Sequence, residues 1–271
     1  GAIIFAGDNT DSYIEIPQGV LNELSDITIS ALVNWKGDNS AEWIFALGKN
    51  HSNDTSKKYI YMTPKYAGGG PARLGLGITG WQNEARAASY LGELDSNRWK
   101  LMTGVMSAKD QTLTLYIDGV EVGTGSTNAY TLEQINNTEG ISGYVAKSFY
   151  NVDPYFGGII ADFRVYNGAL KPFEVKALKE EADIEIAKLD SLLLKYAADG
   201  LDYSDLLKSN SSKDEITTNL SLPTSGAYGT TITWKSSNPQ VVSADGTVKR
   251  PLYEEGDKVV VLTATISYGT N

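Results

Sequence analysis

The loop that begins at residue 81 combines residue types that can bind a sugar. Trp81 stands beside Asn83 and Arg86, directly after the turn-forming stretch Gly77-Ile78-Thr79-Gly80. Sugars stack their apolar ring face on exposed aromatic side chains, while amide and guanidinium groups form hydrogen bonds with sugar hydroxyls. The spacing therefore predicts a glycan-binding surface at Trp81, with Asn83 and Arg86 contacting hydroxyl groups.

Three further residues offer similar chemistry in other segments. They are Trp43, Asp153 and Tyr155, the last two in a predicted loop. Trp43 adjoins Ile44 and Phe45, which makes a core position as reasonable as a binding surface. We expect the core to take the aromatic residues that lie within strand patterns: Trp35, Trp99 and Phe163.

Composition favours a β-rich protein and excludes several classes of partner. The 271 residues include 27 Gly, 16 Tyr and 5 Trp, which suits short strands and tight turns. The formal net charge of -10 repels phosphate backbones, so we exclude nucleic acid as a partner. No apolar run is long enough for membrane insertion, and the absence of Cys excludes disulfides and thiolate metal sites. Because Gly1 is neither an initiator Met nor part of a signal peptide, we expect a piece of a longer chain.

Strand patterns fill the first 170 residues. Segments with the two-residue period of half-buried strands are Tyr13–Ile16, Ile27–Val33, Tyr59–Met62, Arg73–Leu76 and Leu113–Ile117. Asp118-Gly119 predicts a two-residue hairpin turn, because both residues tolerate positive φ. Antiparallel strands without intervening helices indicate a two-sheet sandwich.

The pattern changes at Lys171 and again at Asp214. A helix is predicted from Pro172 to Asp199, with one apolar face made by Leu178, Ala182, Ile186, Leu189, Leu193 and Tyr196. That face is expected to pack on a neighbouring domain, with a coiled-coil partner as the alternative. A short helix follows from Tyr203 to Lys208, and strands return after Asp214, the strongest being Thr231–Ser237 and Val259–Ile266.

The order of several motifs resembles that of LamG-like, concanavalin A-like domains. The motifs are Phe5–Asp8, Ile27–Ala31, Asn97–Lys100, Leu115–Gly119 and Asp162–Tyr166. The later run Ile232–Val248 resembles atrophied bacterial immunoglobulin-like modules of extracellular glycoside hydrolases, with Trp234 as the core aromatic.

The resemblance implies a mainly β fold class in three parts. They are an N-terminal concanavalin A-like jelly-roll β-sandwich (residues 1–170), a helical linker (171–213) and a C-terminal immunoglobulin-like β-sandwich (214–271) that is expected to lack its last strand. This sequence departs from the family in having Ala161 before Asp162, where relatives often have an acidic pair.

The resemblance also implies a structural Ca²⁺ where the first and last strands meet. Relatives take ligands from the loop after the first strand and from the aspartate that matches Asp162. Calcium prefers six to eight oxygen ligands, which include backbone carbonyls. The expected carboxylate ligands are Asp8 and Asp162, and Asp11 is a third, weaker candidate ligand. The alternative is that Asp162 pairs with Arg164 and Asp8 caps a turn.

Hydrolases of this fold usually carry two glutamates and an aspartate on one strand. Glu93-Leu94-Asp95 begins such a pattern, but Arg98 stands in place of the second glutamate. The single His51 lies in a polar loop, which disfavours a Ser-His-Asp triad. We therefore expect this chain to be non-catalytic.

The sequence thus predicts a carbohydrate-binding region of a secreted bacterial glycoside hydrolase, located outside the cell or on its surface. Its expected partners are a polysaccharide, with arabinan or another hemicellulose as the first guess, and the catalytic domain of the same parent chain. The alternative is a structural or adhesive module that binds no sugar. An exposed Trp81 beside Asn83 and Arg86 would favour the first hypothesis.

Overall fold

The computed structural model describes residues 1–7 and 12–268. The chain divides into two units, Gly1–Glu185 and Ile186–Asn271. Asp8 and Asp11, two of the predicted calcium ligands, lie outside the described residues. Within the described ranges, no helix is both long and apolar enough to cross a membrane.

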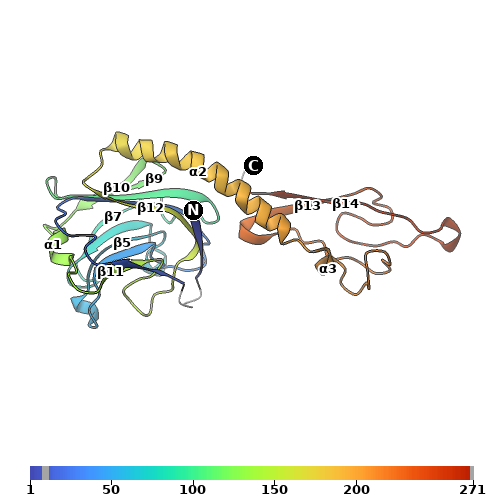
Figure 1. The fold of residues 1–271 in the computed structure, drawn as a ribbon, viewed down its shortest axis with the longest axis horizontal. Helices are drawn as coiled ribbons and strands as arrows, with labels where there is room; N and C mark the ends of the chain where they lie inside the picture. Colours follow the sequence, from blue (N-terminus) through green and yellow to red (C-terminus); the bar gives the residue numbers. More distant parts are fainter. Residues whose placement is uncertain (8–11, 269–271) are drawn as a thin grey trace. The chain divides into compact units, whose positions relative to one another are not determined.

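The first unit is a sandwich of two six-stranded antiparallel sheets (Figure 1). The first sheet consists, in order, of β1 (Ala2–Ala6), β12 (Gly157–Asn167), β3 (Ile27–Trp35), β8 (Trp99–Ser107), β9 (Thr112–Ile117) and β10 (Val120–Ser126). The second sheet consists, in order, of β2 (Ile14–Pro17), β11 (Ile141–Val145), β4 (Phe45–Lys49), β5 (Lys58–Thr63), β6 (Arg73–Gly77) and β7 (Ala85–Ala88). Three short helices lie in its loops: α1 (Leu132–Ile135), η1 (Asp54–Ser56) and η2 (Ala67–Gly69).

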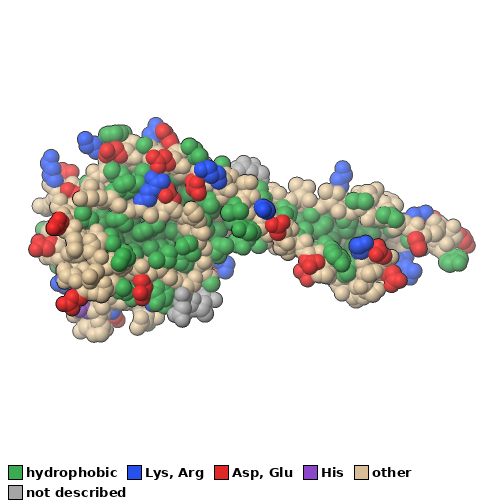
Figure 2. Space-filling model, in the orientation of Figure 1, with side chains coloured by type: hydrophobic (Ala, Val, Ile, Leu, Met, Phe, Trp, Pro, Cys, Tyr) green, Lys and Arg blue, Asp and Glu red, His purple; other side chains and the backbone are tan. Residues whose placement is uncertain are grey.

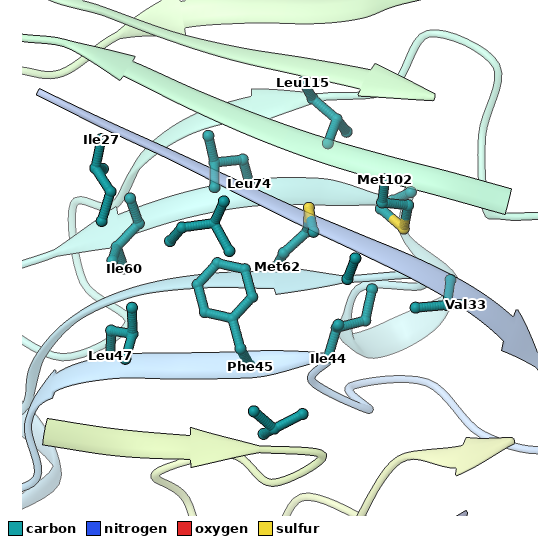
Figure 3. Close-up of a cluster of buried hydrophobic side chains, with 14 of the residues drawn as sticks. Ile27, Val33, Ile44, Phe45, Leu47, Ile60, Met62, Leu74, Met102 and Leu115 are labelled. Carbon is teal, nitrogen blue, oxygen red and sulfur yellow. The ribbon is translucent and has the colours of Figure 1, made fainter. Parts of the chain in front are cut away.

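The core forms between the two sheets because alternate side chains of each strand point inward. Figure 3 shows these side chains meeting from both sheets, among them Val33 of β3, Phe45 of β4, Met62 of β5, Leu74 of β6 and Met102 of β8. The predicted core residues Trp35 and Trp99 are buried, and Phe163 is partly buried against Phe45. The predicted sandwich is confirmed.

The Asp118-Gly119 hairpin joins β9 to β10 as predicted. Val120 pairs with Ile117, and Asp118 and Gly119 have φ of 52° and 77°. Two consecutive positive φ values match a type I′ turn, whose twist suits the flanking strands.

Helix α2 (Pro172–Asp199) has the predicted bounds, but its buried face is slightly rotated. Val175, Ala182, Leu189, Leu193 and Ala197 are buried, whereas the predicted Tyr196 is 53% exposed. Near its start, Val175 packs on Val105 and Tyr116 of the first sheet. Figure 2 shows hydrophobic side chains gathered across the middle of the first unit, with charged side chains mostly around them.

In the second unit, as far as residue 268, β13 (Thr231–Ser236) and β14 (Leu262–Ser267) form a two-stranded antiparallel sheet. It also has the short helices α3 (Tyr203–Leu206), η3 (Ala227–Gly229) and η4 (Tyr253–Glu255). In the chain between β13 and β14, Val242 and Val248 form an isolated antiparallel bridge. Trp234 is only half-buried, and its indole Nε1 donates to the carbonyl of Pro223 at 2.8 Å. Its expected role as the core aromatic is therefore only partly met.

Candidate functional site

The outer face of the second sheet carries the aromatic and charged side chains of the candidate site. Along β5, Ile60 and Met62 enter the core, so Tyr59 and Tyr61 point to the outer face. Tyr61 pairs with Gly75 of β6, and Gly75 pairs with Arg86 of β7. Arg86 therefore lies on the same face as the two tyrosines.

One part of this face is a closed aromatic cluster, which consists of Trp43, Tyr59, Tyr61, Phe149 and Tyr150. The Trp43 ring stacks on Tyr61 with centroids 3.9 Å apart and meets the edges of Tyr59 and Tyr150. Trp43 is only 4% exposed. This burial corrects the expectation that Trp43 offers its ring to a sugar, because neighbouring rings already cover its faces.

Glu84 closes the polar end of the aromatic cluster. Its Oε1 accepts a hydrogen bond from the Tyr59 hydroxyl at 2.7 Å, and its Oε2 accepts one from the Tyr61 hydroxyl at 3.1 Å. Burial raises the pKa of the Glu84 carboxyl above its ordinary value, although both hydrogen bonds act in the opposite direction. Burial also raises the pKa of the Tyr150 hydroxyl, to about 12. Both oxygens of Glu84 thus serve the protein's own hydroxyls.

A polar pocket of about 320 Å³ adjoins the cluster, and we call it the Trp81 pocket. Strands β6, β7 and β10 and the loops beside them supply its walls. Its lining consists of Tyr66, Arg73, Trp81, Asn83, Glu84, Ala85, Arg86, Ser126 and Asn128. The structure therefore brings together the three residues predicted from the sequence loop, Trp81, Asn83 and Arg86.

Trp81 presents its ring to solvent at this pocket. The side chain is 59% exposed, one of the most exposed large aromatic residues of the first unit. Asn83 holds a positive φ of 57°, and its carbonyl accepts from the Tyr130 hydroxyl at 3.1 Å. Asn tolerates this conformation better than most residues, so the loop can turn here while the Asn83 side chain lines the pocket.

Arg73 forms a charged, buried part of the pocket wall. The residue is 6% exposed, and its guanidinium Cζ lies 3.3 Å from the centroid of the Tyr66 ring. Its Nη1 lies 3.8 Å from Oε2 of Glu84, which is a long ion pair. Its Nε has no hydrogen-bond partner among the described residues. A buried guanidinium nitrogen without a partner is costly, which indicates a site with unused donor capacity.

The sequence did not single out the other six lining residues as site residues: Tyr66, Arg73, Glu84, Ala85, Ser126 and Asn128. For Arg73 a signal was present, since Leu74 and Leu76 alternate with it and place it on the outer face. Tyr66, Ser126 and Asn128 come from other loops and strand ends. Their approach depends on the sheet order β6-β7 and on the turn after β10, which local sequence does not give.

Asp153 and Tyr155 lie outside the lining of the Trp81 pocket. Asp153 Oδ2 accepts from the Ser148 hydroxyl at 2.6 Å within its own loop. The Tyr155 ring meets Tyr13 edge-on, and the ammonium of Lys147 lies 5.0 Å from its centroid. The structure places these two predicted residues in a separate group that stabilises the 148–155 loop.

Asp162 lies at a β-bulge of β12, where the pairing with β3 shifts between Ala161 and Arg164. Its Oδ1 accepts from Arg164 Nε at 2.7 Å, and its Oδ2 lies 2.6 Å from Arg164 Nη2. Across residues 1–7 and 12–268, no group of three or more His, Cys, Asp or Glu is placed to hold a metal. Of the three predicted calcium ligands, Asp162 is the one that the structure describes, and its carboxylate is paired with Arg164, so the calcium site stays a prediction.

The acidic residues weighed for catalysis form ion pairs with lysines. Glu93 pairs with Lys65 at 2.7 Å, and Asp95 pairs with Lys100 at 3.3 Å. His51 is exposed in the loop before η1. Glu93 and Asp95 thus take part in ion pairs with lysines, and His51 belongs to an exposed loop.

Family comparison agrees with this architecture. Residues 8–176, more than half of the chain, match the model described as the concanavalin A-like lectin/glucanases superfamily. The chain belongs to this superfamily. Residues 197–271 of this superfamily member match the model of the atrophied bacterial Ig domain, which confirms the predicted order of the two modules. A comparison with curated proteins finds no match.

Several solved structures are similar to this concanavalin A-like chain. Domain 4 of AbnA, a GH43 extracellular arabinanase from Geobacillus stearothermophilus, in complex with arabinotriose, is 18% identical over 66% of this chain and 87% of that one, with a TM-score of 0.49. The CBM40 of the Ruminococcus gnavus IT-sialidase, bound to alpha2,3 sialyllactose, is 16% identical over 62% and 96%, with a TM-score of 0.46. A SAP-like pentraxin from Limulus polyphemus is 17% identical over 66% and 81%, with a TM-score of 0.44.

Proposed function

We propose that this chain is a non-catalytic carbohydrate-binding region of a secreted bacterial glycoside hydrolase, which it holds on plant or host polysaccharide. The observation that carries the proposal is the exposed Trp81 ring beside a polar pocket that includes Asn83 and Arg86. A sugar ring can stack on the indole while its hydroxyls reach the amide and guanidinium groups.

The site suits retention better than catalysis. Glu84 is the one carboxylate among the residues that line the pocket, and both of its oxygens accept from tyrosine hydroxyls. Hydrolysis by the common mechanisms needs two carboxylates on either side of the bond. A weak binding site is still useful, because tethering raises the effective concentration of a linked catalytic domain near its substrate.

A glycan array that includes arabinan, xylan, galactan, fructan and host glycans tests the proposal. We expect at least one specific signal, lost in Trp81→Ala. Tyr90→Ala is the matched control, because Tyr90 is a 72% exposed aromatic residue outside the pocket lining. Equal loss in both variants would contradict the assignment of Trp81. Silence of the folded protein on every glycan would favour the structural or adhesive alternative.

A further inference from the structure

The charges of the Trp81 pocket differ from those of the whole chain. The protein has a net charge of -10, yet this pocket is lined by two arginines, Arg73 and Arg86, and one carboxylate, Glu84. An anion is repelled by the molecule as a whole, so its binding requires a local cationic site.

The register of the second sheet places the two arginines close together. Arg73 pairs with Ala88 and Gly75 pairs with Arg86, so Arg73 and Arg86 are diagonal neighbours on the outer face of β6 and β7. Such neighbours lie about 7 to 8 Å apart at the backbone, within reach of long side chains. Two guanidinium groups therefore share one side of the pocket.

One carboxylate, Glu84, stands against the two arginines of the pocket, so one positive charge is left without a counter-charge in the lining. Glu84 lies 3.8 Å from Arg73 Nη1, and its oxygens are the acceptors of the Tyr59 and Tyr61 hydroxyls. Arg73 Nε has no hydrogen-bond partner among the described residues, and the exposed Arg86 acts on Glu84 through its charge. Burial on the Tyr66 ring fixes the Arg73 guanidinium before a ligand arrives.

We propose that the Trp81 pocket selects a sugar that carries a carboxylate, with Arg73 and Arg86 as the binding groups for that carboxylate. This inference rests on the proposed function and names its substrate class. Guanidinium groups bind carboxylates through parallel, charge-assisted hydrogen bonds, and a buried one does so with less competition from water. Trp81 stacks on the sugar ring, and Asn83, Ser126 and Asn128 supply hydroxyl contacts. A neutral arabinan offers the two guanidinium groups hydroxyl oxygens but no opposite charge.

The test is an array of acidic glycans printed beside their neutral forms. Suitable pairs are oligogalacturonides with their methyl esters, glucuronoxylan fragments with their carboxyl-reduced forms, and sialyllactose with lactose. We expect the strongest signal on a carboxylated glycan, with a loss of about tenfold or more on its neutral form, the size expected for one charge-assisted hydrogen bond.

Arg86→Gln is the principal variant, because Arg86 is exposed and its loss spares the core. We expect about a tenfold loss of affinity for the acidic glycan and a smaller loss for the neutral form, which loses a hydroxyl contact but no charge pair. Arg98→Gln is the matched control, since it removes one exposed arginine from the same unit outside the pocket. Arg73→Gln is expected to lose more, provided that circular dichroism shows it folded.

The outcomes separate this inference from the proposed function. A neutral glycan bound best, in a manner that depends on Trp81, would overturn the acidic specificity and leave carbohydrate binding in place. Equal effects of Arg86→Gln and Arg98→Gln would also overturn it, since long-range charge would then explain the result. No binding to any glycan would overturn both.

Discussion

The aromatic cluster and the Trp81 pocket lie on the same face of one sheet, but their polar groups are satisfied differently. In the cluster, the Tyr59 hydroxyl donates to Glu84 and lies 2.9 Å from the hydroxyl of Tyr150. In the pocket, Arg73 Nε lacks a partner within the described part of the chain, and Trp81 is largely exposed. Aromatic residues alone therefore do not mark a binding site. The features that mark a binding site are the unpaired Arg73 donor and the exposed Trp81 ring.

Glu84 belongs to both regions. It lines the pocket, and both of its carboxylate oxygens accept hydrogen bonds from tyrosines of the cluster. These hydrogen bonds hold the Glu84 side chain, the one acidic side chain in the pocket lining, in a single orientation. Gly75 makes this arrangement possible, because the Tyr61 ring lies directly over it. The cluster is thus the support on which the pocket is built.

The largest expected effect is a difference in the free energy of unfolding between Trp43→Ala and Trp81→Ala. Trp43 is enclosed by aromatic rings, so its truncation leaves a cavity and should lower the free energy of unfolding by roughly 3 to 5 kcal/mol. Trp81→Ala should change it by less than about 0.5 kcal/mol, because the ring is exposed. Guanidinium denaturation followed by circular dichroism measures both. Equal losses would remove the distinction between support and site.

Gly75→Ala should disturb the support with a single methyl group. A Cβ at Gly75 would lie 2.2 Å from Cε1 of Tyr61, so that ring must move away from Glu84 and Trp43. We expect a loss of about 1 to 3 kcal/mol, as for overpacking in a core. Gly200→Ala is the control, since the nearest atom to its Cβ lies at 3.3 Å. Thermal denaturation compares the two, and a stable Gly75→Ala protein would show that the ring adapts freely.

Much of the fold could be predicted because it depends on local patterns. Alternation of apolar residues gave the strands of the sandwich, and consecutive positive φ values explain why Asp118-Gly119 was a reliable turn. The bounds of the helix from Pro172 to Asp199 could be predicted because Pro is favoured at the first helical position and Gly200 directly follows the last. The prediction that Tyr196 lies on the buried face of this helix was wrong. A 3.6-residue period does not fix which of two adjacent positions faces inward near the end of a long helix.

The candidate site could be predicted only in part, for a physical reason. Trp81, Asn83 and Arg86 are close in sequence, so one loop brings them together. Arg73 joins them through strand pairing, which requires the register of β6 and β7. The sequence does not distinguish the two tryptophans. Trp43 is covered because Tyr59, Tyr61 and Tyr150 surround its ring in the folded sheet, whereas Trp81 is exposed.

Acidification should reveal the burial of Glu84. Burial raises the pKa of the Glu84 carboxyl above its ordinary value of 4.5, so the folded state binds this proton more tightly than the unfolded state. Stability from this group therefore increases as pH falls through the raised pKa toward 4.5, and is absent above that window. Glu84→Gln should flatten this part of the profile of unfolding free energy against pH. Glu139→Gln, at an exposed position, is the control, and identical profiles for both variants would contradict the burial effect.

The smallest effect expected at the pocket is that of calcium removal. The pocket offers one carboxylate, and its oxygens are occupied by hydroxyl donors, so EDTA should leave glycan retention unchanged at the Trp81 pocket. The calcium ion predicted at Asp162 would instead change the Tm, and calorimetric titration of EDTA-treated protein with calcium measures its binding. Retention that disappears with EDTA and returns with calcium would mean that metal shapes the sugar site. The aromatic cluster would then not be sufficient to hold the Trp81 pocket in its binding form, because a metal site elsewhere would also be needed.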